Sequence, residues 1–206
     1  VGDWTKLILK MNPGVKIFAF EPDPAAYAKL ARNCEKQNVI CENIALGATP
    51  EERILFVHES SSGFNSFWRR SLFAAEDLRT AKVRVTTLDG YCAESGVDQI
   101  DFLKIDVEGA EMQVLRGGEG MIGARKISVV QFEYGGTYLD AGTQLKDALG
   151  FFETYGYELY KMFPGGLRRI KNYSQSLENF QYANYLAVSP EDSAGSTRRS
   201  GMNVLD

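Results

Sequence analysis

Two acidic residues, Asp106 and Glu108, lie at the end of an apolar run that begins at Ile100 and breaks at Gly109 into a helical pattern. A short, nearly continuous apolar run is typical of a buried strand in a parallel sheet. Ligands of open α/β sheets bind outside the carboxyl ends of such strands. The two carboxylates are therefore placed where a cationic or hydroxyl-bearing ligand would bind. For one carboxylate alone, helix capping or pairing with the helix dipole would be the better interpretation.

Two further carboxylates follow predicted strands elsewhere in the chain. Glu21 comes directly after Ile17–Phe20, and Glu133 follows a strong apolar run over residues 127–132. In nucleoside-binding α/β folds, an acidic residue in the position of Glu21 accepts hydrogen bonds from ribose hydroxyls. A solvated loop carboxylate is the alternative for each residue taken singly. Because the carboxyl ends of parallel strands meet at one edge of a sheet, we expect these acidic groups to converge.

Predicted strands alternate with helices along the chain. Asp23 is a good N-cap and Pro24 a good first helical residue. The alternation predicts an α/β fold with a mostly parallel sheet and helices on both faces. The last two strands lack a crossover helix between them, which favours an antiparallel edge. The predicted strands cover residues 15–20, 39–46, 53–58, 83–88, 100–107, 127–132, 157–162 and 182–188.

Length, net charge and cysteine content exclude several classes of protein. The 206 residues suffice for one domain, and a net charge of −4 without a long basic block argues against nucleic-acid binding. The pair Arg69-Arg70 is predicted to be solvated surface. Three cysteines without a C-x-x-C spacing argue against a disulfide framework and a zinc site, and favour a reducing, cytoplasmic location. The sequence has no apolar run of transmembrane length and leaves the oligomeric state open.

Two segments are not predicted as regular structure. Residues 60–73 combine Ser and Gly with several aromatic residues, which fits either a mobile lid or a segment docked on the sheet as core. Residues 189–206 are polar and rich in small side chains, so we expect a disordered tail there. The sequence thus predicts one domain over residues 1–188.

Seven segments occur in a fixed order over roughly residues 1–188: Val1 to Thr5, Phe18 to Pro24, Asn43 to Gly47, Val85 to Asp89, Asp101 to Glu111, Val114 to Gly117, and Phe132-Glu133. In this order they resemble the FkbM family of S-adenosylmethionine-dependent methyltransferases. The combination of the Phe-Glu-Pro motif with Ile-Asp-Val-Glu-Gly-Ala-Glu is quite specific to that family.

This resemblance implies a Rossmann-like class I methyltransferase fold, with S-adenosylmethionine as methyl donor. It also implies a hydroxyl acceptor, on a sugar, a glycan or another small molecule such as a secondary metabolite. Family members place a strand and a glycine-rich loop ahead of the first helix, and this chain keeps only the last glycine. We therefore expect the domain to be incomplete at its N-terminal side. By position, the implied cofactor contacts are Gly2 and Asp3 for the methionine part, Glu21 for the ribose, Asn43 and Ala45 for the adenine, and Asp106 facing the donor.

Methyl transfer to a hydroxyl requires in-line positioning and benefits from a base. Asp106, Glu108 and Glu133 are the candidate catalytic residues, for the base, acceptor orientation and sulfonium-side electrostatics, and the sequence does not apportion these roles. His58, the only histidine, ranks below them. Clustered carboxylates also suit a divalent cation, but no regular ligand spacing is present, so no metal site is predicted.

Two other function classes stay open. A degenerate methyltransferase domain could bind a nucleoside or a partner without catalysis, which the missing first strand favours. An NAD-linked oxidoreductase would need a G-x-G-x-x-G loop before Glu21, and the Ile-Asp-Val-Glu-Gly-Ala-Glu segment speaks against it.

Overall fold

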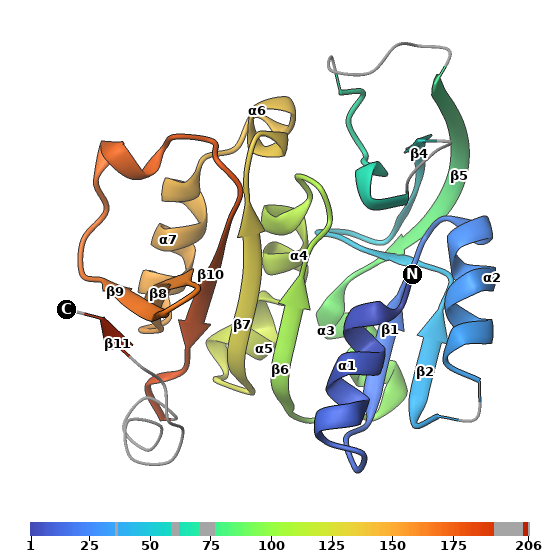
Figure 1. Ribbon diagram of the computed structural model, residues 1–206, viewed down its shortest axis with the longest axis horizontal. Helices are drawn as coiled ribbons and strands as arrows, with labels where there is room; N and C mark the ends of the chain where they lie inside the picture. The colour runs from blue at the N-terminus through green and yellow to red at the C-terminus, as the bar shows by residue number, and fades with distance from the viewer. Residues whose placement is uncertain (36, 59–61, 71–76, 192–203, 206) are drawn as a thin grey trace.

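Strands and helices alternate along most of the chain, as the apolar periodicity predicts (Figure 1). The computed structural model describes residues 1–35, 37–58, 62–70, 77–191 and 204–205. Its first half contains α1 (Asp3–Met11), β1 (Ile17–Phe20), α2 (Pro24–Asn33), β2 (Val39–Glu42), β3 (Ala45–Leu46), β4 (Glu51–His58), η1 (Ser62–Phe64), β5 (Leu78–Thr86), α3 (Leu88–Ser95) and β6 (Ile100–Ile105). The second half contains α4 (Glu111–Gly117), α5 (Glu119–Gly123), β7 (Ile127–Tyr134), α6 (Thr137–Ala141), α7 (Leu145–Thr154), β8 (Glu158–Phe163), β9 (Gly166–Ile170), η3 (Gln175–Leu177), β10 (Ala183–Val188) and β11 (Val204–Leu205).

The largest sheet has the strand order β11-β9-β8-β10-β7-β6. Its β6 and β7 strands are parallel, with Ile105 opposite Phe132, whereas β10 runs antiparallel to both β7 and β8. The register places the carboxyl ends of β6 and β7 side by side. The predicted α/β class is therefore confirmed, as is the antiparallel pairing of the last two predicted strands, β8 and β10. The sheets are mixed, with parallel and antiparallel pairs, and not mostly parallel.

Two smaller sheets stand beside the large one. The β1 and β2 strands form a parallel pair, and β3, β5 and β4 form a mixed sheet. The single strand predicted over residues 39–46 is divided between them, because the chain breaks at Asn43, whose side chain binds back to the carbonyls of Glu21 and Pro22. The β9 and β11 strands were not predicted, because such short strands give little signal. β11 pairs in parallel with β9, so the prediction of a disordered tail over residues 189–206 is wrong for residues 204–205; residues 192–203 and 206 lie outside the described residues.

Within the described part of the chain, β1 and β6 each pair along only one edge. In Figure 1, α1 lies beside β6, and Trp4 of α1 stacks on Phe102 of β6 at 5.9 Å between ring centroids. The expectation of an additional upstream strand and glycine loop stays a prediction.

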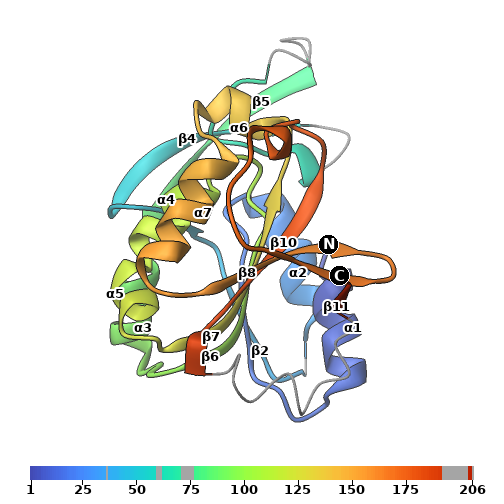
Figure 2. The same ribbon diagram turned by 90° about the vertical axis from the view of Figure 1, so that its left-hand side faces the viewer.

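Helices cover both faces of the sheets, as Figure 2 shows, with α4, α5 and α7 on one side and α1 and α2 on the other. The core lies between the large sheet and α4, α5 and α7. There Phe132 stacks on Tyr185 and Phe152 at centroid distances of 5.5 and 5.6 Å. This fully buried layer fixes β7, and with it the position of Glu133. Within the residues that the structure covers, no helix combines the length and apolar character needed to span a bilayer.

Candidate active site

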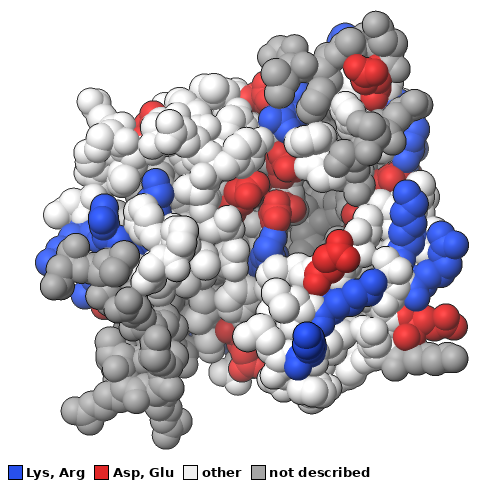
Figure 3. Space-filling model, in the orientation of Figure 1, with Lys and Arg blue, Asp and Glu red and all other residues white. Residues whose placement is uncertain are grey.

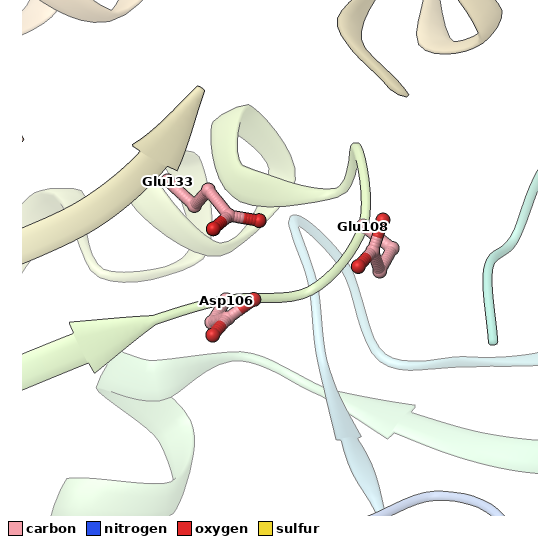
Figure 4. Close-up of side chains that lie close together, drawn as sticks. All are labelled: Asp106, Glu108 and Glu133. Carbon is pink, nitrogen blue, oxygen red and sulfur yellow. The ribbon is translucent and has the colours of Figure 1, made fainter. Parts of the chain in front are cut away.

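Three carboxylates converge at the ends of β6 and β7. Asp106 and Glu108 lie on the loop after β6, and Glu133 projects from β7 toward the same space (Figure 4). One carboxylate oxygen from each residue lies within 4.8 Å of the others. The structure thus brings together all three residues that the sequence predicts as catalytic candidates. In Figure 3, acidic side chains gather around a hollow near the middle of this face.

The loop that carries Asp106 and Glu108 has an unusual backbone. Glu108 and Gly109 both lie in the left-handed region, with φ of 52° and 102°. Such a conformation is costly for a side-chain-bearing residue and persists only where its surroundings enforce it. Here the Glu111 carboxylate accepts hydrogen bonds from the backbone N–H of Val107 at 3.1 Å and of Gly109 at 3.0 Å.

Glu111 is a residue whose role the sequence analysis missed. Glu111 is the first residue of α4 and is only 2% exposed. Burial raises the pKa of Glu111 to about 8, against the effect of the backbone N–H groups that it binds. Because the buried Glu111 carboxylate accepts both of these backbone N–H groups, it holds the loop in its left-handed turn. The signal available in the sequence was the position of Glu111, two residues after Gly109 at the start of a helical pattern.

The three site carboxylates have different electrostatic surroundings. Burial raises the pKa of Glu108 to about 7; Arg70 opposes this effect, while Glu133 and Asp106 add to it. Burial also raises the pKa of Glu133, and Asp106 adds to the rise. Asp106 itself forms a salt bridge with Lys104. A carboxyl group whose pKa lies near neutrality is suited to proton transfer at physiological pH.

A second segment reaches the site from between β4 and β5. Ser66 Oγ donates to the carbonyl of Glu108 at 2.8 Å, and Arg70 forms an ion pair with the Glu108 carboxylate at 3.4 Å. The prediction that Arg70 is solvated surface is wrong, because its residue exposure is 7%. These contacts dock Ser66 and Arg70 against the site, whereas Phe64 is 41% exposed. The choice between lid and core stays a prediction, and residues 60–61 and 71–73 of the predicted lid lie outside the described residues.

Glu21 and Asn43 form a second polar group, at the ends of β1 and β2. Asn43 Nδ2 donates to the carbonyls of Glu21 at 2.8 Å and Pro22 at 3.1 Å. Glu21 Oε1 accepts the N–H of Asp23 at 3.0 Å, and burial raises the Glu21 pKa to about 7. The two predicted contacts of ribose and adenine are therefore adjacent.

The other predicted cofactor contacts have less distinctive surroundings. Gly2 is the N-cap of α1 with φ of 80°, and its Cα faces Leu30 of α2. The Asp3 side chain is 88% exposed, whereas Ala45 is buried in β3. His58 packs against the Phe64 ring at 5.7 Å.

Comparison with known proteins finds a family model, two curated relatives and a solved structure, all described as methyltransferases. Residues 1–159 match the family described as Methyltransferase FkbM domain. A 2-O-methyltransferase NoeI from Sinorhizobium fredii is 26% identical over 179 residues, which cover 81% of this chain and 72% of that protein. A protein named Methyltransferase 1 from Beauveria bassiana is 30% identical over 135 residues, covering 57% of this chain and 54% of that protein.

A solved structure shares the fold. The crystal structure of a methyltransferase FkbM from Methylobacillus flagellatus superposes with a TM-score of 0.53 at 15% sequence identity. The match covers 90% of this chain and 40% of that chain, so this chain spans less than half of that protein.

Proposed function

Because this chain belongs to the methyltransferase FkbM family, we propose that it transfers the methyl group of S-adenosylmethionine to a hydroxyl of a sugar, a glycan or a secondary metabolite. The observation that carries the proposal is the convergence of Asp106, Glu108 and Glu133 at the ends of two parallel strands. The name of the 2-O-methyltransferase relative supports an oxygen acceptor.

The residues present fit the proposed cofactor. S-adenosylmethionine presents two ribose hydroxyls and a positively charged sulfonium group. Glu21 offers a carboxylate at the end of β1, and within the described residues its second oxygen, Oε2, has no hydrogen-bond partner. The acidic cluster is complementary to a cation. We place Gly2 and Asp3 near the methionine part of the cofactor, and Asn43 and Ala45 near its adenine.

We assign the general base to Glu108. When bound, the cofactor supplies an electrophilic methyl group on its sulfonium sulfur. Glu108 accepts the proton of the acceptor hydroxyl, because burial brings its pKa to about 7, near the working pH. Asp106 and Glu133 flank it and would orient the acceptor and face the positive charge of the donor.

We propose that this reaction needs no metal ion. Although one oxygen of each of the three carboxylates lies within 4.8 Å of the others, two of the side chains already have cationic partners. Lys104 pairs with Asp106, and Arg70 pairs with Glu108. Protein cations thus supply charge compensation that a divalent ion would otherwise provide.

We further propose that residues 1–188 belong to the methyltransferase domain and that the protein works in a reducing, cytoplasmic setting. Strand β10 ends at Val188, and the family match lies within this range. All three cysteines are free thiols in the structure, which a reducing compartment would preserve.

Replacing Glu21 with Ala is expected to weaken cofactor binding roughly 10- to 150-fold. The change removes charge-assisted hydrogen bonds to ribose hydroxyls, which contribute about 1.5–3 kcal/mol. Isothermal titration calorimetry with S-adenosylmethionine and with S-adenosylhomocysteine measures this loss directly. Glu35→Ala removes the same charge from an exposed position and should bind like the unmodified protein. Equal affinity of the Glu21 and Glu35 variants would remove Glu21 from the cofactor site. Binding without transfer would instead indicate the non-catalytic binding module.

A further inference from the structure

Arg70 connects three separate parts of the chain at the edge of the acidic cluster. Its guanidinium lies 3.4 Å from Glu108 Oε2 on the loop after β6 and 3.6 Å from Asp140 Oδ2 of α6. It also donates to the hydroxyl of Tyr182, just before β10, at 3.1 Å. The side chain is only 8% exposed. Desolvating a guanidinium is costly unless it is paired. Burial of Arg70 therefore depends on its three partners from distant segments of the chain.

The same segment is fixed to the site by a second, independent contact. Ser66 is 1% exposed and donates from Oγ to the backbone carbonyl of Glu108 at 2.8 Å. Residues 62–70 therefore bind both the main chain and the side chain of Glu108. The left-handed backbone of Glu108, with φ of 52°, is supported from this side as well as by Glu111.

Charge around Glu108 is otherwise unfavourable for a carboxylate. Glu133 and Asp106 face it, and both raise its pKa, although Lys104 pairs with Asp106. Asp140 also pairs with the Arg70 guanidinium and therefore shares its positive charge. Arg70 is the cation in direct contact with Glu108 that opposes these effects.

We propose that Arg70 is a positioning residue that holds residues 62–70 against the acidic cluster, orients the Glu108 carboxylate and favours its ionised form. The consequence for catalysis rests on the proposed function, in which Glu108 is the base. The positioning itself is a property of the protein without any ligand, and it can be measured there.

Removing Arg70 should leave the rest of the domain folded. The segment keeps other anchors, since the Arg53 guanidinium lies 4.3 Å from the Phe67 ring centroid and 5.3 Å from that of Trp68. Ser66 also exchanges two backbone hydrogen bonds with Phe56 of β4, at 2.8 and 3.0 Å. These contacts make Arg70→Met a usable variant, and Arg70→Lys a second one that keeps the charge without the planar fork.

The test is a carbon-13 NMR titration of the Glu108 carboxyl, assigned by its disappearance in Glu108→Gln. In Arg70→Met, the Glu108 pKa should rise by about one unit or more, because an opposite charge in contact lowers a carboxyl pKa by about 1–3 units. Arg70→Lys should show a smaller rise. Arg69→Met is the matched control, since Arg69 is the exposed neighbour, and its titration should equal that of the unmodified protein.

Hydrogen exchange provides the second readout. Amides within residues 62–70 should lose protection in Arg70→Met and keep it in Arg69→Met. An unmoved Glu108 titration in both Arg70 variants would overturn the proposal, as would unchanged protection. Neither measurement involves S-adenosylmethionine, so a failure of the proposed function would show as absent cofactor binding and would be distinguishable from a failure of this inference.

Discussion

Replacing Glu108 with Gln is expected to lower the rate of methyl transfer about 10²- to 10⁴-fold, the usual contribution of a general base. Gln keeps the size of the side chain but has no basic oxygen to accept the hydroxyl proton. The fold should remain intact, because the pKa of Glu108 is raised to about 7 by burial. Its charged form is therefore disfavoured in the folded state, and a neutral side chain relieves that cost.

The same residue predicts how the rate depends on pH. A base with a pKa of about 7 is protonated and inactive below that pH. The rate of the unmodified protein should therefore rise through pH 7, and the residual rate of Glu108→Gln should lack this rise. Glu94→Gln removes one negative charge from an exposed position on α3. It is the matched control and should keep the rate and the pH profile of the unmodified protein. A folded Glu108→Gln protein with an unchanged rate and pH profile would exclude Glu108 as the base.

Replacing Glu111 with Ala is expected to lower the free energy of unfolding by roughly 2–5 kcal/mol. The change leaves the N–H groups of Val107 and Gly109 without their acceptor, and each buried unsatisfied group costs about 1–3 kcal/mol. Relief from burying the carboxylate, whose pKa is raised to about 8, offsets part of this loss. Thermal unfolding should show a drop of roughly 2–4 °C for each kcal/mol lost.

Two comparisons define the role of Glu111. Glu111→Gln can still accept one of the two hydrogen bonds, so its loss of stability should be smaller than that of the Ala variant. Glu119→Ala, at the exposed start of α5, should change the melting temperature little. If Glu111→Ala has the same melting temperature as the unmodified protein, the loop after β6 does not depend on this carboxylate for its conformation.

The parts of the site that sequence reasoning predicted are those that depend on strand ends. Asp106 and Glu133 each follow a nearly continuous apolar run. Parallel pairing of Ile105 with Phe132 brings the two carboxylates together. Most strands were predicted for the same reason, because their apolar pattern is local. The break at Asn43 was missed because it depends on hydrogen bonds to carbonyls about twenty residues earlier.

Arg70 shows why the remainder could not be predicted. Its partners lie 38 and 112 positions away in the sequence, and beside Arg69 it has the composition of an ordinary solvated pair. Glu111 likewise resembles an exposed residue at a helix start, and only the packing of α4 reveals that it is buried. Such contacts between distant segments leave no periodic pattern in the sequence.

A crystal structure of the protein with S-adenosylhomocysteine tests the central claim most directly. We expect ribose hydroxyls bound to Glu21, the adenine beside Asn43, and the sulfur facing the converging carboxylates of Asp106, Glu108 and Glu133. A nucleoside bound elsewhere, or with its sulfur directed away from these three carboxylates, would contradict it.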